Sequence, residues 1–232
     1  MTRRKIQYWV IPPKQNAQFA AHMENILGIY KRPYDERFPV ICMDEQPVQL
    51  LEEVNIPIAA TKNHARRADY EYKRNGTVSI FMFCNPLAGW RDVSVRPRRT
   101  KIDWAIEVER LMTGQYAAAE RVTLVCDNLN THVTGSFYEA FEAEKARSLL
   151  DRLDLQYTPK HGSWLNIAEN ELSSMTRQAM HGHRFATIES IDRQISAWAA
   201  ATNDKQRGVD WHFTVEQARQ KLKHLYPKIQ FR

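Results

Sequence analysis

Three acidic residues stand at the borders of apolar segments in this chain. Asp44 follows the run FPVICM, Asp127 follows the run VTLVC, and Glu169 closes WLNIAE at the start of a predicted helix. A carboxylate just beyond a buried strand is held by a rigid element and still reaches solvent. Three such groups would repel one another strongly unless divalent cations lay between them. The pattern therefore suits metal-assisted phosphoryl transfer, in which paired ions hold the attacking and leaving oxygens.

Each of these acids also has an ordinary structural interpretation when it is taken alone. The segment Asp127-Asn128-Leu129-Asn130 is typical of a turn between a strand and a loop. Glu169 is typical of a first-turn helix acid, which the helix dipole favours. The hypothesis of a shared site rests on the agreement of position, element type and order among all three.

The hydrophobic pattern predicts the elements that must position these acids. The predicted strands are 38–44, 77–83, 90–95, 122–126 and 155–157. The predicted helices are 16–30, 100–113, 134–153, 164–180 and 215–226. Residues 47–69 are predicted to be mostly irregular, with a turn at Arg74-Asn75-Gly76, and 6–11 form a short apolar lead-in.

The order from the first strand onward is β-β-β-α-β-α-β-α, which fits an α/β fold with a mixed sheet flanked by helices. The first three strands are predicted to be antiparallel. The strands of Asp44 and Asp127 can then lie side by side, so that both carboxylates leave the sheet at one edge. The helix of Glu169 can pack across that edge.

Composition indicates a globular protein of 232 residues, with 43% hydrophobic and 26% charged residues. No apolar run approaches the roughly 20 residues that span a bilayer. The basic start MTRRK is not followed by the apolar core of a signal peptide. We therefore expect no membrane association and a cytoplasmic location.

Cysteine usage argues against a disulfide framework and against a zinc site. Cys42, Cys84 and Cys126 are an odd, widely spaced set without a CxxC pair, and each lies in an apolar, strand-like run. We interpret them as small buried hydrophobic residues.

Positive charge is concentrated in the first half of the chain, within a net charge of +6 and a pI of about 9.2. Such patches near a carboxylate site suit a polyanion such as DNA. Charges that protect strand edges are the alternative explanation for any single patch. The DNA-binding candidates in these patches are Arg66, Arg67, Arg74, Arg98, Arg99 and Lys101.

Three segments resemble those of DDE transposases, in particular the bacterial insertion-sequence branch of the mariner-like superfamily. They are VICMDEQ at 40–46, CDNLNTH at 126–132 and YTPKHGSWLNIAE at 157–169, and 67–78 and the Gly89-Trp90 turn match as well. The resemblance implies a ribonuclease-H-like fold. It divides the chain into a lead-in with one helix at 1–35, a catalytic domain at 36–202 and a helical extension at 203–232.

By this resemblance Asp44 and Asp127 bind two catalytic metal ions and Glu169 completes the site. Magnesium is the implied ion, and manganese can substitute for it. The implied chemistry is hydrolysis of a phosphodiester at a transposon end, followed by attack of the freed 3′-hydroxyl on target DNA. The implied partner is DNA, both transposon ends and target, bound by a homodimer.

Neighbours of the three acids are weaker candidates. Glu45 is a candidate for an acid that supports the metal-binding residues without binding the metal itself. Asn128 is a candidate for orienting Asp127 or a metal-bound water. Candidate phosphate contacts are His132, Lys160 and His161, although His132 has a turn or capping role as its alternative. Trp164 either stacks on a base or packs beneath the site.

Two features depart from the family pattern. Asp127 and Glu169 are 42 positions apart, which is longer than is usual in much of the superfamily, and the extra length falls in the helix before residue 153. About 35 residues precede the strand of Asp44, too few for two helix-turn-helix modules. We therefore expect a split or truncated gene, with end recognition supplied by a separate helix-turn-helix polypeptide.

Two other functions remain open from the sequence. One is a different ribonuclease-H-like nuclease that acts on RNA–DNA hybrids or junctions. The other is a truncated, inactive remnant that binds DNA through its basic surface.

Overall fold

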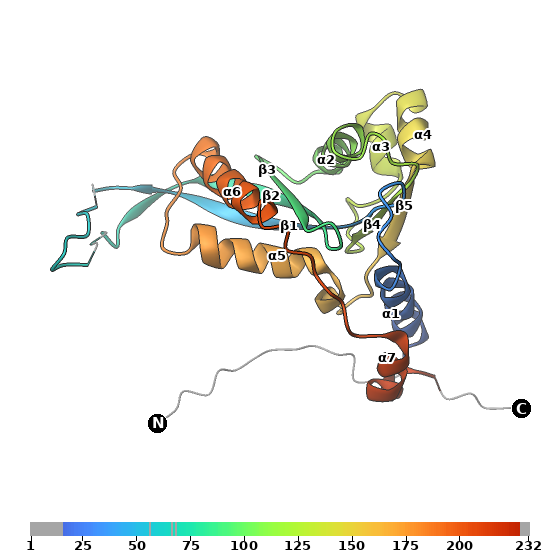
Figure 1. Ribbon diagram of the computed structural model, residues 1–232. Coiled ribbons are helices and arrows are strands. Elements are labelled where there is room, and N and C mark those ends of the chain that lie inside the picture. Colours follow the sequence, from blue (N-terminus) through green and yellow to red (C-terminus); the bar gives the residue numbers. More distant parts are fainter. Residues whose placement is uncertain (1–15, 56, 66, 68, 228–232) are drawn as a thin grey trace, which may run out of the picture.

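The computed structural model describes residues 16–227 except 56, 66 and 68, and its centre is a five-stranded sheet (Figure 1). The strand order is β3-β2-β1-β4-β5. The strands are β1 (Val40–Glu53), β2 (Tyr72–Asn85), β3 (Trp90–Arg96), β4 (Val122–Cys126) and β5 (Leu153–Tyr157). The first three are antiparallel, whereas β4 is parallel to both β1 and β5. This arrangement confirms the predicted mixed sheet and places the strand of Asp44 beside that of Asp127.

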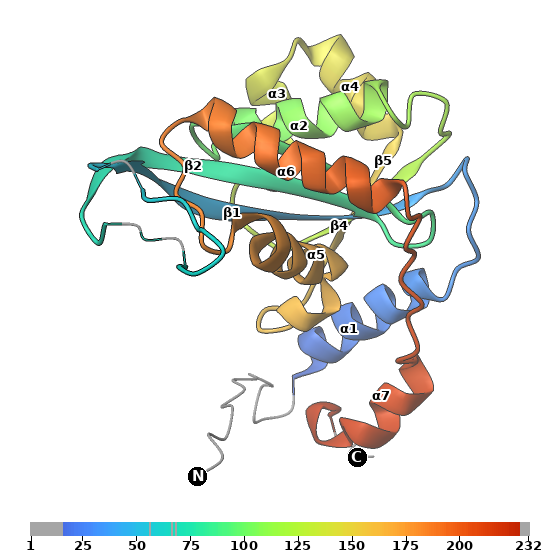
Figure 2. The ribbon, with the colours of Figure 1, turned by 60° about the vertical axis from the view of Figure 1, so that its left-hand side comes forward.

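Helices cover both faces of the sheet. The α-helices are α1 (Ala17–Tyr30), α2 (Lys101–Thr113), α3 (Gly135–Ala140), α4 (Ala143–Asp151), α5 (Ile167–Met175), α6 (Ile188–Asn203) and α7 (Val215–Lys221). Short 3-10 or π turns occur at Ser163–Leu165, Thr176–Met180 and Lys223–Leu225. Figure 2 shows α2, α3 and α4 gathered together, away from α1 and α7. Among the described helices, none is long and apolar enough to cross a membrane.

Two hydrophobic cores follow from the alternation of side chains along the strands. Cys42 and Met82 face one core, which receives α1, α5, α6 and α7. Met43 and Phe83 face the other core, which receives α2, α3 and α4. All three cysteines are buried and free, as the sequence predicted.

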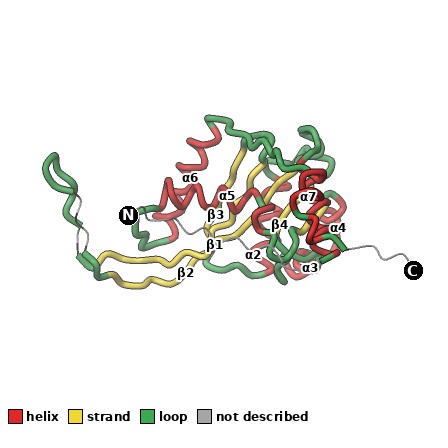
Figure 3. Tube along the Cα trace, turned by 90° about the horizontal axis from the view of Figure 1, so that it is seen from below, coloured by secondary structure: helices red, strands yellow, loops and turns green. Residues whose placement is uncertain are grey.

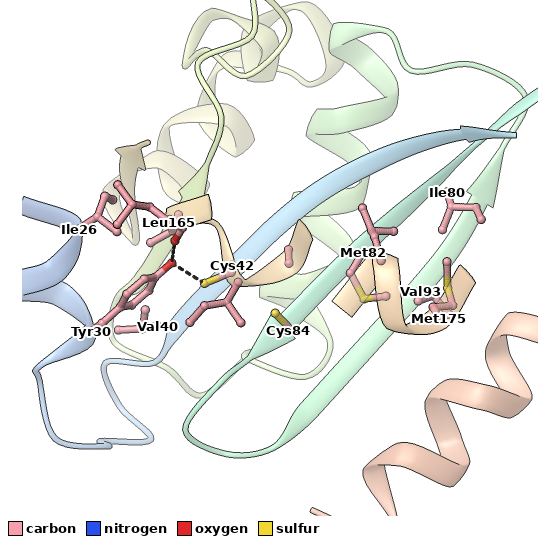
Figure 4. Close-up of a cluster of buried hydrophobic side chains, with 14 of the residues drawn as sticks. Ile26, Tyr30, Val40, Cys42, Ile80, Met82, Cys84, Val93, Leu165 and Met175 are labelled. Carbon is pink, nitrogen blue, oxygen red and sulfur yellow. Dashed lines mark hydrogen bonds between the residues drawn. The ribbon is translucent and has the colours of Figure 1, made fainter. Parts of the chain in front are cut away.

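The helix at the start of the described chain is part of the first core. Asn16 caps α1 with its side-chain oxygen, which accepts from the Phe19 N–H at 2.9 Å. The Tyr30 hydroxyl, at the end of α1, donates to the Leu165 carbonyl at 2.6 Å and lies 3.3 Å from the Cys42 sulfur (Figure 4). This bond ties α1 to the segment that leads into α5.

β1 is longer than predicted. It continues to Glu53 through a region predicted to be irregular, with Pro47 opposite Ser79 of β2. A proline is tolerated in an edge strand because no partner needs its missing N–H. β4 pairs only with Val40–Cys42, so beyond Cys42 that side of β1 is an edge.

The turn predicted at Arg74-Asn75-Gly76 is a β-bulge instead. β2 runs on without a break, and its register with β1 shifts between Gln49 and Leu51. Gly76 has a φ of +91°, which side-chain-bearing residues rarely adopt. The β1–β2 pair therefore projects from the body as a long arm (Figure 3).

The helix predicted at 134–153 is broken into α3 and α4. Phe141, between them, has extended backbone angles and packs its partly buried ring near Phe137, at 6.4 Å between centroids. The burial of the Phe141 ring outweighs the helix propensity of the segment. The sequence gives no sign of the break, because no glycine or proline lies between the two helices. The α6 helix was also not anticipated.

A buried ion pair fastens α5 to the sheet. Arg91 of β3 donates to both carboxylate oxygens of Glu171, at 2.9 and 2.8 Å, and the two side chains are only 5% and 11% exposed. The carboxamide of Asn203, on α6, pairs with the backbone N–H and C=O of Arg91, each at 2.8 Å. The start of β3 is thus held by two helices.

We predict that Arg91→Ala lowers the free energy of unfolding by about 3–5 kcal/mol, because it leaves the Glu171 carboxylate buried without its partner. Urea denaturation measures the loss. The double variant Arg91→Met/Glu171→Leu removes both charges and should recover most of the stability. A double variant no more stable than Arg91→Ala would contradict this account.

Candidate active site

Asp44, Asp127 and Glu169 are carried by three elements that meet where β1 and β4 part. β1 and β4 pair in parallel only from Val40 to Cys42, so both strands lead their aspartates to the same edge. Asp44 is the second residue of β1 beyond this pairing, and Asp127 directly follows β4. Open α/β sheets commonly bind ligands beyond the carboxyl ends of their parallel strands.

Asn166 sets the position of the third acid. Its side-chain oxygen caps α5 by accepting from the Ala168 N–H at 3.1 Å, and its nitrogen donates to the Met43 carbonyl at 2.9 Å. The first turn of α5, which holds Glu169, is thereby tied to the residue before Asp44. Sequence reasoning missed Asn166, although an asparagine before a helix is a recognisable capping signal.

The charge at Asp44 is strongly disfavoured in the metal-free protein. Burial is the largest cause that raises the pKa of this carboxyl to about 7; the negative charges of Asp127, Glu169 and Glu45 add to it, and one hydrogen bond opposes it. That bond is the Glu45 N–H, 2.8 Å from Asp44 Oδ1. Asp44 therefore lies within electrostatic reach of both other acids.

The donor set fits a divalent cation. It consists of carboxylate oxygens, the preferred ligands of Mg²⁺ and Ca²⁺. A cation would also offset the repulsion that raises the pKa of Asp44. Among the described residues, no group of three or more acidic, histidine or cysteine side chains is placed so that it could hold a metal ion as it stands.

His132 is a buried part of the site rather than a DNA contact, which corrects the sequence-based expectation. The residue is fully buried, and its ring stacks on Trp104 at 5.2 Å. Nε2 lies 3.1 Å from Glu45 Oε1. Nδ1 lies 2.8 Å from Asp127 Oδ1, although the hydrogen-bond direction is toward the Asp127 backbone oxygen at 3.1 Å.

The histidine is charged in this setting. Burial alone would lower the pKa of His132, but the hydrogen bonds that the ring makes to Asp127, Cys126 and Glu45 outweigh it and raise the pKa to about 12. The imidazolium therefore stands between two carboxylates throughout the ordinary pH range. Glu45, predicted to support the metal-binding residues, is linked to Asp127 through the His132 ring, which contacts both side chains.

The other predicted residues lie at varied places. Arg99 is exposed and shares a hollow with Glu45 and Asn128, and Lys160 shares another with Asn128. The roles predicted for them stay predictions. Further candidates are exposed and untested: Arg98 and His161 in loops, Arg67 and Arg74 on the arm, and Lys101, which pairs with Glu139 at 2.6 Å. Arg66 lies outside the described residues.

A groove of about 570 Å³ opens on the side of β1 that faces α5. Asp44 and Glu169 line it, together with Ser173 and Arg177. Glu169, Ser173 and Arg177 follow one another at four-residue spacing, so the helix presents them on one face. Arg177 is exposed and was missed, although this spacing was readable from the sequence.

Trp164 belongs to the packing beneath the site. Its ring is partly buried and meets Phe213 edge-on, with 5.8 Å between centroids. The packing alternative stated for this residue is therefore the one that the structure supports.

The strand order, with three antiparallel strands followed by two parallel ones, defines a ribonuclease-H-like fold. A family model described as DDE superfamily endonuclease matches residues 39–192. The chain belongs to this family, and it carries the catalytic core fold of DDE endonucleases and transposases. No curated protein matches the sequence.

Solved structures of the Mos1 mariner transposase have a similar fold. The pre-cleavage Mos1 transpososome matches with a TM-score of 0.58 at 15% identity, over 99% of this chain and 68% of that chain. The Mos1 strand transfer complex matches with 0.58 at 14% identity, over 89% and 61%. The Mos1 paired-end complex with Mn matches with 0.55 at 15% identity, over 89% and 62%. At these identities the likeness shows the fold alone, and the chain spans about three fifths of Mos1 in the last two complexes.

We predict that Asp44→Asn stabilises the metal-free protein at pH 8 by on the order of 1–3 kcal/mol. The pKa of Asp44 is raised from an ordinary 3.8 to about 7, so the stability given by its protonated form is complete below pH 3.8 and is lost as the pH rises through about 7. Urea denaturation in EDTA at pH 4 and pH 8 measures the gain, which should shrink at the lower pH. The exposed Asp210→Asn is the control, and an equal gain at both pH values would contradict the prediction.

We predict that His132→Ala lowers the free energy of unfolding by about 3–5 kcal/mol, since it leaves the buried Glu45 carboxylate without its cation. The matched control is His212→Ala, whose side chain is 84% exposed and whose loss should change stability by less than about 0.5 kcal/mol. Chemical denaturation compares the two. Similar small effects for both would show that His132 is not part of a buried charge pair.

Proposed function

We propose that this chain is the catalytic core of a DDE transposase, which hydrolyses a phosphodiester at a transposon end and joins the freed 3′-hydroxyl to target DNA. The observation that supports the proposal is that the half-buried Asp44 lies within electrostatic reach of Asp127 and Glu169, in a chain whose residues 39–192 match the DDE family. Hydrolysis and joining are both in-line displacements at phosphorus, so one site serves both.

Asp44, Asp127 and Glu169 are the residues that would hold two Mg²⁺ ions, or Mn²⁺ in their place. Bound ions would supply charge stabilisation for the attacking and leaving oxygens. The chain's own contribution is to hold the carboxylates. Asn166 fixes the α5 turn of Glu169 to β1, and the imidazolium of His132 restrains Asp127 while it leaves the outer face of that carboxylate open.

The groove beside Asp44 is the proposed path of the reacting strand. Arg177 would contact a phosphate along this groove, roughly 12 Å from Glu169 at 1.5 Å per residue of helix. Arg99 and Lys160 flank the opposite side, near Asn128. Because phosphate contacts release counterions, we expect affinity for DNA to fall steeply with salt and to be largely independent of sequence.

We also propose that the protein acts on DNA as a homodimer, in the bacterial cytoplasm at the nucleoid. The similar Mos1 structures are described as a paired-end complex and a strand transfer complex. These descriptions support a reaction that joins two ends. Recognition of the ends by a separate helix-turn-helix polypeptide belongs to the same proposal.

The test uses purified protein with three labelled DNAs: a duplex copied from the flank of its gene, the same end already cut, and an RNA–DNA hybrid. With Mg²⁺ or Mn²⁺, we expect strand transfer from the pre-cut end. Asp127→Asn should lose about 10³-fold or more of this activity, because a ligand of the ions is removed, whereas the exposed Asp210→Asn should retain it.

Two results would overturn the proposal. Cleavage of the hybrid alone would assign the protein to ribonuclease-H-like nucleases. Binding to every DNA without product, with or without metal, would leave a DNA-binding remnant.

A further inference from the structure

Gln46 and Thr176 meet at the wall of the groove beside Asp44. Gln46 follows Asp44 by two residues on β1, so the alternation of side chains along a strand places both on the face toward α5. Thr176 lies at the end of α5, where the helix passes into the π turn Thr176–Met180, a departure that is frequent at functional sites. Both residues line the groove and both are half-buried.

One hydrogen bond fixes the orientation of the Gln46 carboxamide. The Thr176 hydroxyl donates to Gln46 Oε1 at 3.1 Å. Since the carbonyl end is occupied, the end left for a ligand is Nε2, which carries two N–H donors and no acceptor. Nε2 has no hydrogen-bond partner within the described part of the chain and is not one of its fully buried polar atoms, so solvent in the groove reaches it.

A neutral donor at this place suits an oxygen of a phosphate. A lysine or arginine at position 46 would pair with Asp44 and compete with a metal ion there, whereas an amide does not. Glutamine is one of the side chains that commonly donate to DNA phosphates. The groove also holds the exposed guanidinium of Arg177, directly after Thr176, which is a second donor for the same strand.

The spacing along the groove indicates which phosphate each donor meets. Asn166 contacts β1 at Met43 and Thr176 contacts it at Gln46, so α5 runs beside β1 in the same direction. Two residues along a strand span about 7 Å, which is comparable to the separation of successive phosphates in one DNA strand. Arg177, roughly 12 Å along the helix from Glu169, is about two such steps away.

We propose that Gln46 binds the phosphate next to the reacting phosphate, and that Thr176 orients the Gln46 carboxamide for this contact. The inference rests on the proposed function, since the reacting phosphate is the one that the three acids would cut or join. Arg177 then meets the following phosphate. The contact of Gln46 fixes the position of the strand along the groove, so that one particular phosphodiester lies at the acids.

The test measures the contribution of each phosphate to DNA affinity. Uncut end duplexes carry a single methylphosphonate, in which a methyl group replaces one non-bridging oxygen, at each position around the cut site in turn. Fluorescence anisotropy in Ca²⁺ at one fixed salt concentration gives the dissociation constants, and a gel confirms that no product forms. Cleavage of the unmodified duplex in Mg²⁺ maps the reacting phosphate.

For the unmodified protein, we expect the methylphosphonate next to the reacting phosphate to weaken binding about tenfold more than methylphosphonates outside the groove. Gln46→Met removes the donor and should abolish this excess at that position only, while the neighbouring positions keep their effect. Thr176→Val removes the hydroxyl at nearly constant shape and should reduce the excess to about threefold or less. Gln49→Met, at an exposed position on the opposite face of β1, is the matched control and should keep the full pattern.

Two results would overturn the Gln46 contact. One is the same dependence on phosphate position in Gln46→Met and in the unmodified protein. The other is a uniform weakening at every position in Gln46→Met, since this is the effect of a lost tie between α5 and β1 without any contact to DNA.

Strand transfer from the pre-cut end in Mg²⁺ separates this contact from the proposed function. Products together with an unchanged phosphate pattern in Gln46→Met would refute the contact and leave the proposed function standing. A single phosphate that depends on Gln46, without products from any DNA, would support the contact and refute the transposase reaction.

Discussion

The repulsion among three carboxylates at the parting of β1 and β4 is the constraint on which the rest of the structure depends. Parallel pairing over only Val40–Cys42 brings the two strands side by side just before Asp44 and Asp127. The cost appears at Asp44, whose pKa burial and its acidic neighbours raise to about 7. Contacts outside the trio have to hold the elements together against this repulsion.

Those contacts share one principle: the acids next to the trio are paired with cations. Glu171, two residues beyond Glu169, is matched by a bidentate bond from Arg91. Glu45, next to Asp44, is matched by the imidazolium of His132, which also lies 2.8 Å from Asp127 Oδ1. These buried pairs hold the strand and helix in place beside the trio.

Sequence reasoning found what depends on local pattern. The strand order and the elements that carry the three acids follow from hydrophobic period and residue type, and the structure has both. It failed where distant contacts decide. Nothing local reveals that β1 is an edge at Pro47, or that His132 is enclosed by Trp104 and Glu45. Residue spacing did contain the signal for Arg177, which a four-residue period from Glu169 would have exposed.

The family match ends at residue 192, yet the position of Glu169 depends on segments beyond the matched region. Tyr30 of α1 holds the Leu165 carbonyl, in the turn before α5. The α1 helix is in turn held by the end of the described chain, since Arg219 of α7 makes a bidentate bond with Glu24 and the Asn16 N–H donates to the Leu225 carbonyl at 2.9 Å. A fragment trimmed to the matched residues would keep all three acids but lose the packing that sets the approach of α5 to β1. The working unit of this site is therefore the core together with α1 and α7.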